Sequence, residues 1–266
     1  MRNAHLVIID PQNDFCSPSG SLYVPGAEAD MDRLALFVHR MKDRLAQIHV
    51  TLDSHRTVDI SHPVWFRNSH GDHPAPFSQI SADDLRSGTW TTTLPGAWQR
   101  TLDYLASLES LGRYPHTIWP EHCLIGSEGH NVHPTLFDSL QEWSARFALV
   151  DFVTKGSNPW TEHFSAVAAE VPDPADPATQ VNTGLIQTLE AADVVYLAGE
   201  ASSHCLANTV RDIAANFGDA SWISKLVLLE DTTSPVPGFE PFEDAFLKEL
   251  TAAGMRTSST TALLAA

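Results

Sequence analysis

The chain has 266 residues, of which 43% are hydrophobic, so it can bury a substantial core. It carries 33 acidic and 16 basic residues, and the resulting net charge of -17 repels phosphate backbones and anionic membranes. We therefore expect neither nucleic acid nor a membrane as a partner. The three cysteines are too few and too scattered for a disulfide framework. Without a long apolar run or the apolar core of a signal peptide, a cytoplasmic location is the expectation.

Short apolar runs recur along the chain, and most are followed by a helical pattern. Runs that are apolar on both faces are typical of strands buried on both sides in a parallel sheet. Five clear runs and a weaker sixth predict strands at residues 5–9, 48–52, 147–153, 194–198, 226–229 and 256–259.

Helix-like segments fill the intervals between these runs. At residues 32–45 and 205–217, apolar side chains recur on one helical face. Four further segments predict helices at residues 135–146, 160–171, 182–191 and 239–253. Strands that alternate with helices indicate a three-layer α/β domain.

The interval between the second and third predicted strands is unusually long. It runs from residue 53 to about residue 146, is rich in Pro, His and Trp, and has room for an extra helix at residues 96–108. A stretch of this kind favours a functional excursion over a second domain. We therefore predict a single domain over residues 1–266, with an insert at about residues 63–118.

Reactive side chains follow the predicted strands at the point where each strand ends. Asp10 comes after the first strand, Asp53 and His55 after the second, Lys155 after the third, and Cys205 after the fourth. In an open parallel sheet, ligands bind beyond the carboxyl ends of the strands. The sequence thus predicts that an acid, a lysine, an imidazole and a thiol share one edge of the sheet.

Cys205 begins an amphipathic helix, where the positive end of the helix dipole favours a thiolate and free N–H groups can hold an oxyanion. Asp10 could accept the thiol proton and return it to a leaving amine, with Lys155 beside both. Each residue taken alone also has a structural interpretation: a buried cysteine, a turn aspartate and a surface lysine.

Asp53 and His55 are separated by one residue, so on an extended segment both point the same way and can reach one ion. Aspartate and histidine ligands suit Zn²⁺, Fe²⁺ or Mn²⁺. A third ligand must come from elsewhere in the chain, and His122 is the best candidate. We therefore expect one divalent metal ion as cofactor.

These motifs resemble those of nicotinamidases, also called pyrazinamidases, within the isochorismatase-like cysteine hydrolase superfamily. The matching segments span most of the chain in the family's order. They are Val-Ile-Ile-Asp-Pro-Gln-Asn-Asp-Phe-Cys at residues 7–16, Gly-Ser-Leu-Tyr-Val-Pro-Gly-Ala at 20–27, Thr-Leu-Asp-Ser-His at 51–55, Trp-Pro-Glu-His-Cys at 119–123 followed by Gly129 and His133-Pro134, Lys155-Gly156, and Gly-Glu-Ala-Ser-Ser-His-Cys at 199–205.

The resemblance implies a six-stranded parallel sheet and the hydrolysis of nicotinamide, or a similar small planar amide, to the acid and ammonia through a thioester. The site residues that it implies are a triad of Asp10, Lys155 and Cys205, a metal set of Asp53, His55 and His122, an oxyanion hole from the N–H groups of Ala201 and Cys205 after a cis Glu200–Ala201 peptide, and a substrate ring held between Phe15 and Trp119.

One departure concerns the metal. Nicotinamidases usually carry another histidine four residues after the first metal-segment histidine, where this chain has Asp59. His62 could take that place, or Asp59 could contribute an oxygen ligand. Other interpretations keep the fold but change the substrate to another small amide or a ureido acid, or remove catalysis and leave a binding protein. The family often assembles, so a homo-oligomer is also an expectation.

Overall fold

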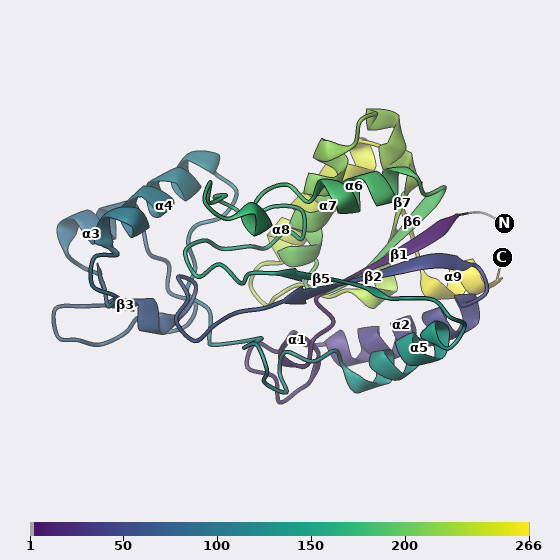
Figure 1. Ribbon diagram of the computed structural model, residues 1–266, viewed down its shortest axis with the longest axis horizontal. Helices are drawn as coiled ribbons and strands as arrows, with labels where there is room; N and C mark the ends of the chain where they lie inside the picture. The colour runs from purple at the N-terminus through teal and green to yellow at the C-terminus, as the bar shows by residue number, and fades with distance from the viewer. Residues whose placement is uncertain (1–2, 266) are drawn as a thin grey trace.

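A computed structural model, which describes residues 3–265, places one six-stranded sheet between two layers of helices (Figure 1). The strands are β1 (Ala4–Ile9), β2 (Leu45–Asp53), β5 (Asp151–Lys155), β6 (Val194–Gly199), β7 (Leu226–Leu229) and β8 (Arg256–Ser258). They lie in the order β5-β2-β1-β6-β7-β8, and every neighbouring pair is parallel. This arrangement confirms the predicted three-layer α/β fold with its parallel six-stranded sheet.

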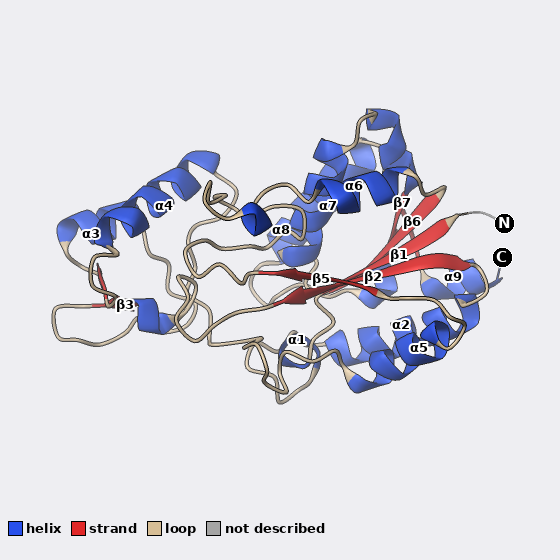
Figure 2. Ribbon diagram, in the orientation of Figure 1, coloured by secondary structure: helices blue, strands red, loops and turns tan. Residues whose placement is uncertain are grey.

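Helices cover both faces of the sheet (Figure 2). One layer holds α2 (Ala27–Met41), α5 (Pro134–Ser144) and α9 (Thr260–Ala265), and the other holds α6 (Thr183–Glu190), α7 (Cys205–Asn216) and α8 (Glu240–Ala252). The short helix α1 (Asn13–Cys16) follows β1. All six residues of β1 are buried, because this central strand is covered on both faces. That double burial explains why β1 reads as a continuous apolar run.

The insert between β2 and β5 extends away from the sheet (Figure 1). It contains a two-stranded antiparallel sheet of β3 (Phe66–Arg67) and β4 (Thr91–Thr92), with α3 (Ala82–Ser87) and α4 (Trp98–Leu111) packed beside it. Its buried side chains form a hydrophobic cluster separate from the main core, centred on Trp65, whose indole N–H donates to Thr101 Oγ1 at 3.1 Å. The helix predicted at residues 96–108 is confirmed as α4.

The helix predicted at residues 160–171 is wrong, since this segment is irregular. Its amides donate to distant groups instead of to an i-4 carbonyl. Ala166 N donates to Thr209 Oγ1, Ala169 N to Thr179 O, and Val171 N to Thr161 Oγ1. Tertiary hydrogen bonds therefore override an apolar spacing that resembles a helix.

Some predicted boundaries also differ from the structure. The third strand of the sequence pattern, expected from residue 147, begins at Asp151, and Phe147 instead has a left-handed backbone with φ of 62°. The helix expected at residues 32–45 is α2, which ends at Met41 because Leu45 already begins β2. Met1, Arg2 and Ala266, which belong to the predicted domain, lie outside the described residues. Within residues 3–265, no helix combines the length and the apolar character that crossing a membrane requires.

Candidate active site

Lys155 lies at the centre of a buried cluster where three strands end. Its Nζ is 2.9 Å from Asp10 Oδ2, 3.1 Å from Asp53 Oδ1 and 3.7 Å from Cys205 Sγ, and it donates to His163 O at 3.0 Å. The Asp10 carboxyl also accepts a hydrogen bond from Thr51 Oγ1 at 2.5 Å. The structure thus brings together the acid, the lysine and the thiol that the sequence placed after separate strands.

Backbone conformation brings these groups close together. Asp10 has φ of 42°, a left-handed value that is uncommon outside glycine. Gly199, at the end of β6, has φ of 104°, and a Cβ there would lie 2.0 Å from Ile9 O. Gly156 has φ of 79°, and a Cβ there would lie 2.7 Å from Asp53 Oδ1. Only glycine therefore lets the nucleophile loop and the lysine approach the ends of β1 and β2 so closely.

Burial sets the charge state of the thiol. It raises the pKa of Cys205 well above its usual range, although the Lys155 ammonium acts in the opposite direction. The start of the helix favours a thiolate, whereas removal from water favours the neutral thiol. Burial also raises the pKa of Asp10, and Lys155 opposes that shift. Burial would lower the pKa of Lys155, but Asp10 and Asp53 raise it well above its usual value.

Two backbone donors lie beside the thiol. The Glu200–Ala201 peptide is cis, as the resemblance implied. The N–H groups of Ala201 and Cys205 donate to no acceptor within residues 3–265, whereas the neighbouring Ser202 N donates to Ser234 O at 3.0 Å. The site therefore offers two free donors next to the nucleophile, which is what a developing oxyanion requires.

A second group of side chains fits a metal ion. One ligand atom from each of Asp53, His55 and His122 lies within 4.8 Å of the other two, and all three residues are buried. Asp53 Oδ2 is 3.2 Å from His55 Nε2 and 3.5 Å from His122 Nε2. Two imidazoles and a carboxylate that converge in this way match the donor set of a catalytic divalent metal site.

The two further candidates, Asp59 and His62, occupy different places. Asp59 Oδ2 lies 3.0 Å from His55 Nδ1, so Asp59 orients that ring and leaves Nε2 facing Asp53. The His62 ring lies 5.1 Å from the His55 ring and 5.5 Å from the His122 ring. Its Nδ1 is 3.1 Å from Arg56 O, and its buried Nε2 has no partner among the described residues. Of these two residues, only His62 therefore has a buried ligand atom without a partner among the described residues, and that atom could bind an ion.

A small cavity joins the thiol to the metal-type group. It has room for about 30 Å³ of water, and its walls are Phe15, Leu22, Asp53, Trp119, His122, Glu162, Phe164, Ala201, His204, Cys205 and Val236. The predicted pocket residues Phe15 and Trp119 are both present. Burial lowers the pKa of His204 to about 3, so this ring is a neutral wall of the cavity. Sequence reasoning missed Glu162 and Phe164 because they lie in the segment that it assigned to a helix.

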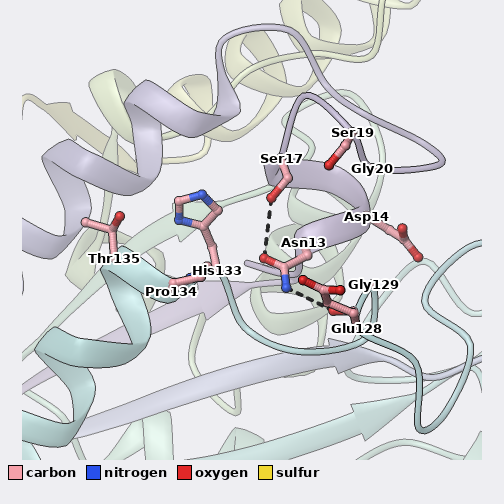
Figure 3. A pocket seen from close by; sticks show the side chains of 10 residues that line it. All are labelled: Asn13, Asp14, Ser17, Ser19, Gly20, Glu128, Gly129, His133, Pro134 and Thr135. Carbon is pink, nitrogen blue, oxygen red and sulfur yellow. Dashed lines mark hydrogen bonds between the residues drawn. The ribbon is translucent and has the colours of Figure 1, made fainter.

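A larger hollow lies outside this cavity, between the loop after β1 and the loop before α5 (Figure 3). It measures about 470 Å³ and contains no cysteine or lysine. Asn13 Nδ2 donates to Glu128 O at 2.9 Å, and Ser17 Oγ donates to Asn13 Oδ1 at 3.4 Å. Its polar groups therefore hold two loops together, and we place the chemistry in the smaller cavity at Cys205.

The fold and the cavity define a hydrolase that can deliver a nucleophile to a small buried substrate. No family model matches the chain. Two curated relatives do. The nicotinamidase of Escherichia coli (strain K12) is 25% identical over 209 residues, which cover 78% of this chain and 74% of the relative. The nicotinamidase of Saccharomyces cerevisiae is 27% identical over 233 residues, which cover 87% and 88%.

Solved structures agree with the fold. A nicotinamidase/pyrazinamidase from Acinetobacter baumannii matches with a TM-score of 0.65 and 22% identity over 99% of both chains. The yeast nicotinamidase, also solved with the inhibitor nicotinaldehyde, matches with a TM-score of 0.65 and 23% identity over 96% of this chain and 98% of its own. A Pyrococcus horikoshii pyrazinamidase in complex with zinc matches with a TM-score of 0.56 and 17% identity over 97% and 99%. The comparisons confirm the resemblance to nicotinamidases and indicate an amidohydrolase acting on a carbon–nitrogen bond.

Proposed function

We propose that the protein hydrolyses nicotinamide to nicotinic acid and ammonia, with Cys205 as the nucleophile. The observation that carries this proposal is the contact of one buried ammonium, Lys155 Nζ, with Asp10, Asp53 and Cys205. Lys155 thereby connects the Cys205 thiol and the Asp10 carboxyl to Asp53, which belongs to the metal-type group. The names of the sequence relatives support the choice of substrate.

The first half of the reaction transfers a proton as the carbon–sulfur bond forms. Cys205 Sγ attacks the carboxamide carbon while its proton passes to the Asp10 carboxylate, which pairs with the Lys155 ammonium at 2.9 Å. The carbonyl oxygen takes up the negative charge and binds the N–H groups of Ala201 and Cys205. When the carbon–nitrogen bond breaks, Asp10 returns the proton to the leaving nitrogen, and ammonia departs from a thioester.

In the second half of the reaction, water is the nucleophile and the Cys205 thiol is the leaving group. A water molecule gives its proton to Asp10 as it attacks the thioester carbon, and the same N–H groups hold the oxyanion. The carbon–sulfur bond then breaks, Cys205 recovers a proton from Asp10, and the carboxylic acid leaves. Each proton that Asp10 accepts is thus returned, so the enzyme ends in its starting state.

We propose that Asp53, His55 and His122 hold one divalent metal ion, with His62 as a further donor. The convergence of three ligand atoms and the unpartnered His62 Nε2 support this assignment. The zinc complex of the pyrazinamidase from P. horikoshii makes zinc the first metal to test. When bound, the ion would supply a Lewis acid that accepts the ring nitrogen of the substrate, directly or through water.

Phe15 and Trp119 would hold the substrate ring between them. Phe15 packs edge-on against the His122 ring with 5.5 Å between centroids, and Trp119 packs edge-on against His204 at 5.3 Å. The cavity has space for about 30 Å³ of water, enough for a single water molecule. A pyridine ring is much larger, so its entry requires side chains of the cavity wall to move.

The test is ammonia release from nicotinamide by the zinc-loaded protein, compared with Cys205→Ala and with Cys16→Ala. Cys16 is another buried cysteine and does not line the cavity, so its variant controls for the loss of a buried thiol. We expect turnover by the wild type and by Cys16→Ala, and none by Cys205→Ala. A folded, zinc-loaded wild type that releases no ammonia from nicotinamide would reject this substrate.

A further inference from the structure

Glu162 is a buried carboxyl whose bonding is incomplete. The residue is 5% exposed, and its Oε1 accepts a hydrogen bond from His163 N at 3.1 Å. Its Oε2 is buried and has no partner within residues 3–265. A buried polar atom without a partner destabilises the folded state, because it has lost its hydrogen bonds to water. Such an atom therefore calls for a ligand, an ion or a water molecule that satisfies it.

The position of Glu162 indicates which of these partners its Oε2 atom would bind. Its side chain lines the cavity together with Asp53, His122 and Cys205. Burial raises the pKa of Glu162, and the charged groups that act on it most strongly are His55, Asp53, Asp59 and His122. Glu162 therefore shares the cavity wall with two of the three residues of the metal-type group.

His62 and Glu162 differ in their relation to the cavity. Both carry a buried atom without a partner among the described residues, but only Glu162 lines the cavity. Glu162 is also outside the group of residues whose ligand atoms lie within 4.8 Å of one another. It is therefore placed to act on the cavity-facing side of an ion through an intervening water molecule, as second-layer carboxylates do in metal sites.

We propose that Glu162 is a positioning residue, which holds water on the cavity-facing side of a metal ion bound by Asp53, His55 and His122 and thereby fixes where the substrate ring docks. The proposal rests on the metal site of the proposed function. Loss of such an outer partner typically lowers metal affinity about 10–100-fold. Loss of the docking position raises KM more than it lowers kcat.

Glu170 provides a matched control. It lies in the same irregular segment, its backbone N donates to Glu162 O at 2.9 Å, and it is also 5% exposed. Both of its carboxyl oxygens lack a partner in the described part of the chain, but it does not line the cavity. A change at Glu170 therefore alters a buried carboxyl in the same segment without altering the metal side of the cavity.

The experiment measures zinc affinity by competition with a chromophoric chelator for the wild type, Glu162→Gln, Glu162→Ala and Glu170→Gln. We expect Glu162→Ala to lower zinc affinity about 10–100-fold, Glu162→Gln to lower it less, and Glu170→Gln to match the wild type. If Glu162→Ala fails to fold, the isosteric Glu162→Gln decides the question. Wild-type zinc affinity in the folded Glu162 variants would overturn the proposal.

Binding of nicotinate to the zinc-loaded proteins, measured by calorimetry, separates this proposal from the proposed function. Nicotinate is present in a matching structure from L. infantum, and its binding needs no turnover. If the wild type fails to hydrolyse nicotinamide but the Glu162 variants still lose affinity for zinc, the substrate is wrong and the role of Glu162 stands. If the wild type binds no zinc, the role of Glu162 is rejected.

Discussion

Asp10 is the only carboxyl in the cluster that contacts Lys155 and also accepts from Thr51 at the end of the neighbouring strand. We expect Asp10→Asn to lower kcat by at least about 100-fold with little change in KM, because the amide cannot accept the thiol proton. Steady-state kinetics would measure both parameters.

The control for that variant is Asp231→Asn. Asp231 lies two residues after the end of β7, and its carboxyl accepts from Thr260 N at 2.8 Å and from Thr260 Oγ1 at 2.6 Å at the start of α9. Its loss is expected to affect stability and to leave kcat near the wild-type value. Equal kcat values for Asp10→Asn and the wild type would contradict the proposed proton transfer.

Glu170 makes stability depend on pH. Burial raises its pKa to about 7, although Arg113 opposes the shift. Since the unfolded side chain has a lower pKa, 4.5, the folded state binds more protons between these values. The contribution of Glu170 to stability is therefore complete below pH 4.5 and is lost as the pH rises through about 7.

We expect Glu170→Gln to abolish the loss of folding stability that Glu170 causes as the pH rises. That loss amounts to about 3 kcal/mol at most. Urea unfolding at pH 5 and at pH 8 would measure it. The free energy of unfolding of the wild type should fall relative to the variant as the pH rises. Parallel pH profiles for the two proteins would show that the Glu170 carboxyl does not stay protonated in the folded state.

At the scale of single residues, the sequence could predict Asp10, Asp53, Lys155 and Cys205, because each lies at or shortly after the end of an apolar run. It could not predict Glu162, which reaches the cavity from a segment without regular structure. The effect of burial on the Cys205 thiol could not be predicted for a related reason. Helix position is visible in a sequence, but the burial that raises the pKa of a thiol depends on residues far along the chain.

At the scale of elements, the insert is a separate packing unit joined to the active site. Trp65 is 1% exposed in its cluster, and Trp119, in the return segment, lines the cavity. Phe77, also from the insert, packs edge-on against Trp119 with 5.8 Å between centroids. Loosening this cluster should therefore disturb the cavity wall before it disturbs the sheet.

We expect Trp65→Ala to destabilise the insert by about 3–5 kcal/mol, since it removes a large buried side chain and its hydrogen bond to Thr101. Hydrogen exchange would show faster exchange of amides in α3 and α4 and little change in β1 and β6. Uniformly faster exchange across the sheet would show that the insert and the main core unfold together.

The elements themselves differ in how well the sequence predicts them. The buried strands and the amphipathic helices α2 and α7 follow from periodicity alone, because each satisfies its own backbone or pairs with a neighbouring strand. The segment at residues 160–171 does not, since its amides bond to Thr161, Thr179 and Thr209. Contacts of that kind are fixed by the folded chain and leave no period in the sequence.

At the scale of the whole molecule, the edge of the sheet at β5 exposes large apolar side chains. Phe147 is 103% exposed, Leu149 85% and Phe152 45%. Phe152 and Phe137 line a hollow of about 690 Å³ beside this edge. The exposed edge strand and the side chains of Phe147 and Leu149 lie beside this hollow. The same face of a second copy can pair with such a surface.

The expected homo-oligomer stays a prediction, and this edge is where we expect two copies to meet. Light scattering at micromolar concentration should report a dimer for the wild type and a monomer for Phe147→Asp, with ammonia release retained in both. Substitution of Leu36, which is 51% exposed on α2, by Asp is the control and should leave the dimer intact. A wild-type protein that is monomeric under these conditions would contradict the predicted homo-oligomer.

The central claim, that Cys205 forms a thioester with the acyl part of nicotinamide, can be tested by acid-quenched mass spectrometry. The zinc-loaded protein is mixed with nicotinamide, quenched within one turnover and digested. We predict the mass of a nicotinoyl group on the peptide that contains Cys205, and none on the peptides of Cys16 and Cys123. Release of ammonia without any acyl adduct, or unchanged turnover in Cys205→Ala, would contradict the mechanism.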